Sequence, residues 1–205
     1  MLEKNFVQKK IYTPSEYNRQ EILRYASCRK EDETVNELLD EIIAECEKQK
    51  IFSGGVSFIC VPVNIEENRI DFSYFSVVSS DLKKNLAGCS SAVIFAATVG
   101  IKFDQYLRRF QQTSITKTAL FLALGAERVE NVCNQFNDEV KKICMENNCK
   151  CHARFSPGYG DLPLALQKNI LPLLDANRKL GISLNDSLLM SPSKSVTAII
   201  GIEEL

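Results

Sequence analysis

The sequence predicts an α+β fold in which long helices pack on a mostly antiparallel, twisted sheet. Patterns typical of amphipathic helices are mixed with strand patterns, and residues 55–65 and 69–78 are expected to form two strands joined by a short turn. The continuous apolar run 90–101 is typical of a strand that is covered on both faces. We find no repeat, low-complexity segment or long linker, so a single domain over residues 1–205 is expected.

Six helices follow from the spacing of apolar residues and from start and stop signals. Thr13 to Ser15 provides a start signal for the first helix, Ser80 and Asp81 are expected to cap the third, and Pro172 should break the last. The predicted helices cover residues 15–26, 32–50, 81–88, 101–112, 113–148 and 161–181. The alternating segment 195–202 should form a final strand, after an extended segment over 153–157.

Charge and hydropathy exclude several classes of function. The 25 basic and 26 acidic residues nearly cancel, and no basic stripe is present, so nucleic acid is not an expected partner. The longest apolar run is too short to span a bilayer, and the first ten residues lack the apolar core of a signal peptide. We therefore expect a cytoplasmic protein with no membrane partner.

Eight cysteines are scattered along the chain and need not form disulfides in a protein of this size. Cys149, Cys151 and His152 form a tight C-x-C-H cluster, with Cys144 as the nearest further ligand. Their spacing is tighter than that of common zinc sites, and no second ligand pair follows. A structural role for the cluster is favoured, and a metal or redox role stays open.

The sequence contains no recognisable set of catalytic residues. His152 is the only histidine, and the chain has no serine-hydrolase, phosphate-loop or dinucleotide-binding motif. The sequence therefore gives no candidate for a catalytic nucleophile or general base.

The stretch RFSPGYGDLPLALQ (154–167) combines turn residues with side chains that a turn does not need. Pro157 and Gly158 form a turn dipeptide, Gly160 relaxes the backbone, and Asp161 is expected to cap the helix that follows.

Arg154 and Tyr159 have no part in that turn chemistry. An arginine offers a planar fork to a carboxylate, and a tyrosine offers a ring face and a hydroxyl. Glycines nearby let a ligand approach the backbone closely. On the residues alone, a simple connection and a site for a small zwitterion both remain open.

This stretch, together with LLDANRKLGISLNDSLLMSPSKSVTAIIGI (173–202), resembles the reactivation, S-adenosylmethionine-binding domain of cobalamin-dependent methionine synthase, above all its short stand-alone forms. Further segments fit the family in order: EILRYASCRKED (21–32), SSDLKKNLAGCSSAVIFAATVGIKFDQYLRRF (79–110) and LALGAERVENVC (122–133). The resemblance spans about residues 15–202 and implies the fold of that activation domain.

The resemblance implies a function. In this family, cobalamin that has oxidised to the inactive Co(II) form is rescued by one-electron reduction, usually from a flavodoxin-like donor, coupled to methyl transfer from S-adenosylmethionine. The domain holds the methyl donor over the corrin, so its contribution is positioning. The chain would then be a component of methionine synthase in methionine biosynthesis, with S-adenosylmethionine as its ligand and cobalamin carried by a partner subunit.

The resemblance also implies a ligand site, residue by residue. Arg154 matches the arginine that meets the ligand carboxylate, and the backbone at Ser156 matches a further contact. Gly158 and Tyr159 match the glycine and tyrosine of the family motif. Glu130 is the nearest match to an acidic residue on the preceding long helix.

Two departures from the long enzymes bear on that site. Gly160 and Asp161 stand where those enzymes carry a proline after the tyrosine, and they agree with the stand-alone forms. The chain ends soon after 195–202, whereas the longer domains continue and supply a second tyrosine, so a partner is expected to complete the pocket. Lys194 and Ser195 are expected to be structural.

The alternative is a protein of a different class. It would be a non-catalytic scaffold that docks on a corrinoid methyltransferase without binding S-adenosylmethionine.

Overall fold

The computed structural model describes residues 5–12, 15–28 and 32–205. Over those residues the chain forms ten β-strands and seven α-helices. The strands are β1 (Gln8–Tyr12), β2 (Gly54–Pro62), β3 (Asn64–Glu66), β4 (Arg69–Asp71), β5 (Ser76–Val78), β6 (Ser91–Thr98), β7 (Cys149–Cys151), β8 (Ser183–Leu184), β9 (Met190–Ser191) and β10 (Ser195–Glu204). The helices are α1 (Arg19–Tyr25), α2 (Glu33–Gln49), α3 (Ser80–Asn85), α4 (Lys102–Thr113), α5 (Ile115–Glu146), the 3₁₀ turn η1 (Leu164–Leu166), α6 (Gln167–Leu173) and α7 (Ala176–Leu180).

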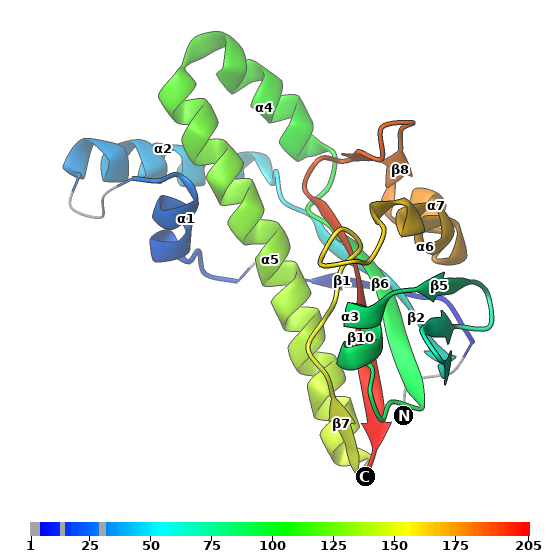
Figure 1. Cartoon of the computed structure of the whole chain (residues 1–205). Coiled ribbons are helices and arrows are strands. Elements are labelled where there is room, and N and C mark those ends of the chain that lie inside the picture. The colour runs from blue at the N-terminus through cyan, green and yellow to red at the C-terminus, as the bar shows by residue number, and fades with distance from the viewer. Residues whose placement is uncertain (1–4, 13–14, 29–31) are drawn as a thin grey trace.

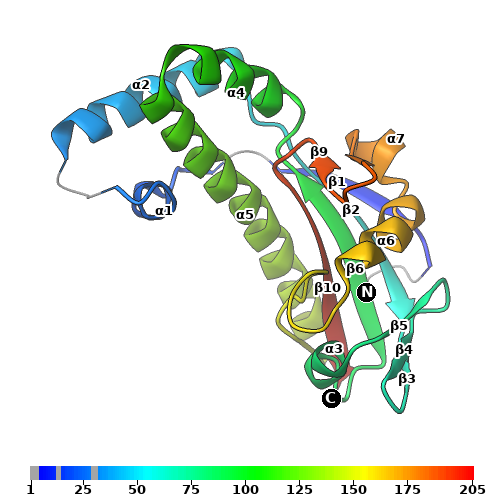
Figure 2. The same ribbon diagram turned by 45° about the horizontal axis from the view of Figure 1, so that its top comes forward.

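A five-stranded sheet in the order β1-β2-β6-β10-β7 forms the centre of the fold, and every neighbouring pair is antiparallel. The register places Ile94 of β6 between Ile59 and Ile199 on the flanking strands. All eight residues of β6 are buried, as the apolar run predicts, because helices cover the sheet on both faces. Figures 1 and 2 show α5 crossing one face while α6 and α7 lie on the other.

The helix α5 is held to the sheet by an aromatic cluster. Phe136 lies 4.9 Å from the ring of Phe58 on β2 and 4.9 Å from that of Phe95 on β6, measured between ring centroids. Val132 and Val140 lie about one turn of helix to either side of Phe136 and are also buried against this face. The burial of this stripe fixes which residues of α5 point away from the sheet.

On the opposite face of the sheet lie the remaining strand side chains, every second one along each strand. They pack against the C-terminal helices. Ile59, Ile94 and Ile199 form one core with Leu166 and Ile170. Successive strand residues therefore lie in one core and then the other, because neighbouring side chains of a strand point to opposite faces of the sheet.

A helical lobe extends beyond the sheet, where α1, α2 and α4 pack around the first half of α5 (Figure 1). Phe103 of α4 stacks on Phe121 of α5 with ring centroids 4.6 Å apart. Gly125, one turn further along α5, also faces the Phe103 ring. The chain needs a glycine there because any side chain would overlap the ring.

A buried ion pair, which the sequence did not predict, ties the N-terminal segment to α5. The guanidinium of Arg128 donates to the Glu127 carboxylate at 2.5 and 2.6 Å, and to the carbonyls of Ser15 and Glu16 at 2.7 and 2.9 Å. Both side chains are almost fully buried, and the guanidinium also lies over the ring of Tyr17. The carbonyls of Ser15 and Glu16 accept from guanidinium N–H groups that an ion pair with Glu127 alone would leave without a hydrogen bond.

The α+β class and the mostly antiparallel sheet are confirmed. The predicted hairpin turn is also confirmed, because β3 pairs with β4 and Glu66 lies opposite Arg69, but the two long strands predicted over 55–65 and 69–78 are wrong. β2 ends at Pro62, and the chain then forms a separate three-stranded sheet of β3, β4 and β5. The second predicted strand is broken by a turn in which the Phe72 N–H donates to the Phe75 carbonyl at 3.0 Å and Ser73 takes a φ of 69°. Burial of Phe72 in the core holds that turn.

Several predicted helix ends also differ from those observed. The first helix begins at Arg19 behind an Asn18 cap, and Thr13 and Pro14 lie outside the described residues. The cap of α3 is Ser79, one residue before the predicted pair. Pro172 lies inside α6, and the break follows it at Asp175, whose φ is positive.

The strands β1 and β7 were not predicted because each is short and lies at a sheet edge, where alternation carries little signal. The helices in the described part of the chain lack the combined length and apolar character that crossing a bilayer requires.

We predict that Gly125→Ala lowers the free energy of unfolding by about 1–3 kcal/mol through overpacking against Phe103. This loss should outweigh the roughly 0.5–1 kcal/mol that alanine gains over glycine inside a helix. Urea denaturation measures it, with the exposed Lys142→Ala of the same helix as a control that should change stability by less than about 0.5 kcal/mol. A stabilised Gly125→Ala protein would contradict this packing.

Candidate ligand-binding site

The segment that contains the arginine motif runs beside β10 as a continuation of β7. The His152 N–H donates to the Gly201 carbonyl at 2.9 Å, and Phe155 exchanges two backbone hydrogen bonds of 2.8 Å with Ile199. This pairing confirms that the segment is extended. It places the loop that follows between α5 and α3 (Figures 1 and 2).

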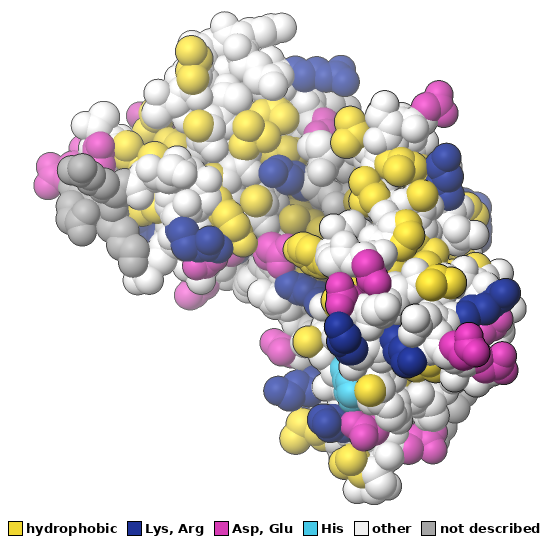
Figure 3. Space-filling view, viewed as in Figure 1, with side chains coloured by type: hydrophobic (Ala, Val, Ile, Leu, Met, Phe, Trp, Pro, Cys, Tyr) yellow, Lys and Arg dark blue, Asp and Glu magenta, His cyan; other side chains and the backbone are white. Residues whose placement is uncertain are grey.

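Arg154 and Glu130, which are 24 positions apart in sequence, meet at this place. Nη2 of Arg154 donates to Oε2 of Glu130 at 2.6 Å. The arginine side chain is 26% exposed and the glutamate 42% exposed, so the pair lies at the edge of the surface. Figure 3 shows the surface hollowed between the helical lobe and the sheet, with charged and hydrophobic side chains around the hollow.

The other guanidinium nitrogen of Arg154 is not satisfied. Nη1 is buried and has no hydrogen-bond partner among the described residues. A buried donor without a partner is costly, and an arginine fork fits the two oxygens of a carboxylate. Half of the fork is therefore without a partner among the described residues, and an anionic group reaches Nη1 only when the side chains that cover it move.

Residues 156–162 form a tight turn that presents Tyr159. The Tyr159 N–H donates to the Ser156 carbonyl at 3.1 Å, and the Gly158 N–H donates to the Leu162 carbonyl at 2.9 Å. Gly158 has a φ of 95°, a backbone conformation that other residues rarely adopt. The turn leaves the Tyr159 side chain 65% exposed, with its ring edge-on to Phe155.

Asp161 does not cap the helix after it, contrary to the sequence-based expectation. Its carboxylate accepts the backbone N–H groups of Ser80 and Asp81 at 2.7 and 3.2 Å, and the hydroxyl of Ser79. These three residues begin α3, so the carboxylate joins two segments about 80 positions apart. No local pattern could reveal such a pairing, because Asp161 also has the spacing of an ordinary cap.

Hydrogen bonds to the carboxylate, above all that from Ser79, lower the pKa of Asp161 below its ordinary value. The carboxylate is therefore ionised at neutral pH.

His152 has a structural environment. Its Nδ1 lies 2.6 Å from the Asn85 carbonyl and its Nε2 lies 3.0 Å from Oε2 of Glu203. The ring thus links the end of α3 to β10. Hydrogen bonds from His152 and Lys150 lower the pKa of Glu203.

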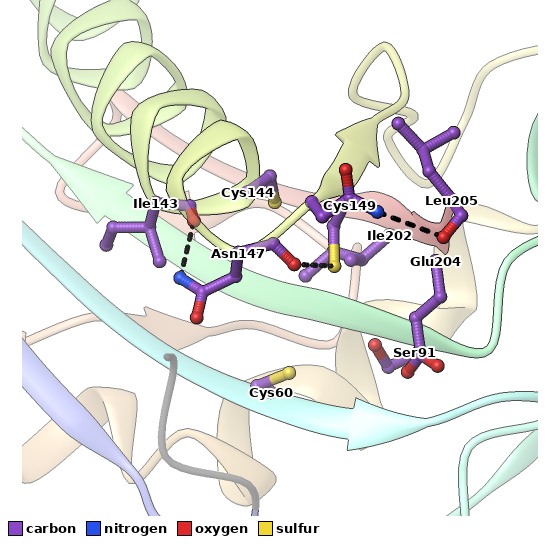
Figure 4. A pocket seen from close by; sticks show the side chains of 10 residues that line it. Cys60, Ser91, Ile143, Cys144, Asn147, Cys149, Ile202, Glu204 and Leu205 are labelled. Atoms are coloured by element: carbon purple, nitrogen blue, oxygen red, sulfur yellow. Dashed lines mark hydrogen bonds between the residues drawn. The ribbon is translucent and has the colours of Figure 1, made fainter.

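The neighbouring thiols line a separate cavity at the far end of the sheet. Cys60, Cys144 and Cys149 line a cavity of about 340 Å³. Figure 4 shows these side chains at the cavity together with Ile143 and Ile202. All eight cysteines are free thiols. Among the described residues, no three or more His, Cys, Asp or Glu side chains come together in a way that would hold a metal ion.

The loop that carries Lys194 and Ser195 contacts both β6 and α4, and the Ser193 N–H donates to Asp104 of α4 at 2.9 Å. Ser195 Oγ donates to the Pro192 carbonyl at 2.7 Å and lies 2.9 Å from Thr98 Oγ1. Burial lowers the pKa of Lys194, whose amino group lies 5.9 Å from the Phe103 ring centroid. These contacts agree with the structural role expected for Lys194 and Ser195.

Burial raises the pKa of Cys46 and of Cys133 to about 12. Since the thiolate is the reactive form and a raised pKa keeps the thiol protonated, we predict negligible alkylation of both at pH 8 in the folded protein. Iodoacetamide labelling followed by mass spectrometry measures this, with the urea-unfolded protein as the fully labelled control. Rapid labelling of either residue before unfolding would contradict its burial.

Comparison with known proteins supports one family. The family model described as vitamin B12 dependent methionine synthase, activation domain, matches residues 82–204. Among solved structures, a crystal structure of the MetH reactivation domain bound to AdoHcy is similar, with a TM-score of 0.72 and 15% sequence identity. That similarity covers 98% of this chain and 79% of the other, and at this identity it shows the fold.

A search of curated proteins gives no match. The family match covers more than half of the chain and includes most of α3, the Arg154 turn and the central strands β6 and β10. This chain therefore belongs to the family of vitamin B12 dependent methionine synthase activation domains.

Proposed function

We propose that this chain binds S-adenosylmethionine and supports the reductive remethylation of cob(II)alamin carried by a methionine synthase partner. The proposal takes residues 1–205 as one activation-like domain. It is supported by the family of the chain and by its similarity in fold to a reactivation domain bound to AdoHcy.

The observation that carries the proposal is the half-satisfied guanidinium of Arg154. Nη2 is bonded to Glu130, while Nη1 is buried without a partner in the described part of the chain. S-adenosylmethionine has a carboxylate that would complete this fork. It also carries positive charges on its amino group and sulfonium, which Glu130 is placed to offset.

The remaining proposed contacts come from the turn beside Arg154. Ser156 would contribute backbone groups, since its N–H lies on the side of the segment away from β10. Gly158 leaves room for close approach, and the exposed ring of Tyr159 offers a flat surface to the ligand.

This arrangement suits a methyl transfer without a general base. The sulfonium of S-adenosylmethionine is already an activated leaving group, so the protein needs to bind and orient the donor. Cobalamin held by the partner would supply a reduced metal centre as the methyl acceptor, and this chain would release S-adenosylhomocysteine after the transfer. A flavodoxin-like protein is the proposed source of the electron.

We predict that Arg154→Ala raises the Kd for S-adenosylmethionine about 10- to 100-fold, because the ligand carboxylate loses a charged, two-point partner. Isothermal titration calorimetry measures this for the wild-type and variant proteins.

The matched control is Arg178→Ala, which removes an exposed arginine that also pairs with an acidic residue, Asp175. Its Kd should stay within about twofold of wild type, since surface pairs far from a site contribute little. Equal binding by Arg154→Ala and wild type would refute the site.

A second candidate function is a scaffold that docks on a corrinoid methyltransferase without binding S-adenosylmethionine. The exposure of the site favours it, because the Tyr159 side chain is largely exposed and two cavities, of about 340 and 480 Å³, are lined by residues outside the proposed site.

Titration in the presence and absence of a cobalamin-loaded methionine synthase distinguishes the two functions. The scaffold predicts binding of the partner protein with no heat from S-adenosylmethionine in either case. The reactivation role predicts ligand binding that the partner strengthens.

A further inference from the structure

The turn that presents Tyr159 is fixed at both of its ends, by two different parts of the fold. At one end, Phe155 is paired with Ile199 of β10 through two hydrogen bonds of 2.8 Å. At the other end, the Asp161 carboxylate accepts from the first residues of α3. Only five residues separate these two anchors, so their positions determine the path of the turn.

The contact at Asp161 is reciprocal. Asp81 accepts the Asp161 N–H at 3.3 Å through Oδ2, while its own N–H donates to Asp161. Gly160 has a φ of 51° and lies so close to the Asp81 carboxylate that a Cβ atom would overlap it. Gly160 and Asp161 thus form one docking unit with Ser79, Ser80 and Asp81.

The carboxylates of Asp81 and Asp161 lie close together in this unit, and neighbouring donors offset both negative charges. Asp161 is ringed by the hydroxyl of Ser79 and two backbone N–H groups. Asp81 is paired with Lys84 at 3.2 Å. The arrangement uses an ionised carboxylate as an acceptor from three donors, which an amide of the same shape would not match.

We propose that Asp161 is a positioning residue for S-adenosylmethionine binding, acting through the turn that carries Tyr159. Asp161 does not contact the ligand in this proposal. It holds the turn against α3, so that the Tyr159 side chain stays in place at the site. The inference rests on the proposed function of the site.

The test is a double-mutant cycle on the full chain with S-adenosylmethionine as the probe. Asp161→Asn should raise the Kd about tenfold, because a loosened turn must be ordered again on binding. In a Tyr159→Ala background the same change should raise the Kd by less than about twofold, since the side chain that it positions is already gone. The inference is overturned if the rise in Kd of the double variant equals the product of the rises in the two single variants. It is also overturned if Asp161→Asn binds with wild-type affinity.

The matched control is Asp32→Asn, which alters a carboxylate that accepts the Val35 N–H at 3.1 Å as the cap of α2. Its Kd for S-adenosylmethionine should equal that of wild type. Should Asp161→Asn fail to fold, Ser79→Gly replaces it: glycine is tolerated as a helix cap and removes one donor to Asp161. A rise of about threefold in Kd is expected for Ser79→Gly, and none would count against the inference.

Amide hydrogen exchange separates failure of this inference from failure of the proposed function. In the ligand-free protein, Asp161→Asn should speed the exchange of the Gly158 and Leu162 amides, whose hydrogen bonds close the turn. If wild type does not bind S-adenosylmethionine, the proposed function fails whatever the exchange shows. If wild type binds while the variant changes neither exchange nor Kd, only the role of Asp161 fails.

Discussion

The packing of α5 across the central sheet is the constraint on which the rest of the molecule depends. Phe136 lies between Phe58 and Phe95, so the rotation of the helix about its axis is fixed by aromatic contacts in the core. With that rotation set, Glu130 faces the segment that runs beside β10 and meets Arg154. A core interaction thereby places one half of the candidate site.

The other half follows from strand pairing. The short pairing of β7 with β10, continued at Phe155, carries the chain back along the sheet to a point opposite α5. From there the turn reaches the start of α3, where the Asp161 carboxylate accepts the Ser80 N–H. The site therefore combines a helix, a sheet edge and a distant helix start, and none of the three would hold its geometry alone.

The sequence predicted what depends on local periodicity and missed what depends on tertiary contacts. The buried strand β6 and the long helix α5 were foreseen because their apolar patterns are strong. The break between β4 and β5 was not, because alternation continues through the turn that burial of Phe72 imposes. Asp161 had the right neighbours for a helix cap, yet its carboxylate lies on α3, and only the three-dimensional arrangement distinguishes the two.

The open character of the site is consistent with positioning rather than catalysis. One guanidinium nitrogen of Arg154 is buried without a partner in the described part of the chain, and the Tyr159 side chain is 65% exposed. An unsatisfied buried donor costs free energy in the ligand-free protein, and a carboxylate that restores its hydrogen bonds recovers that cost on binding. Since a methyl group must pass from the ligand to a cobalamin held elsewhere, a donor site enclosed on all sides would block the transfer. A donor site that the partner's cobalamin can approach is therefore what the proposed reaction requires.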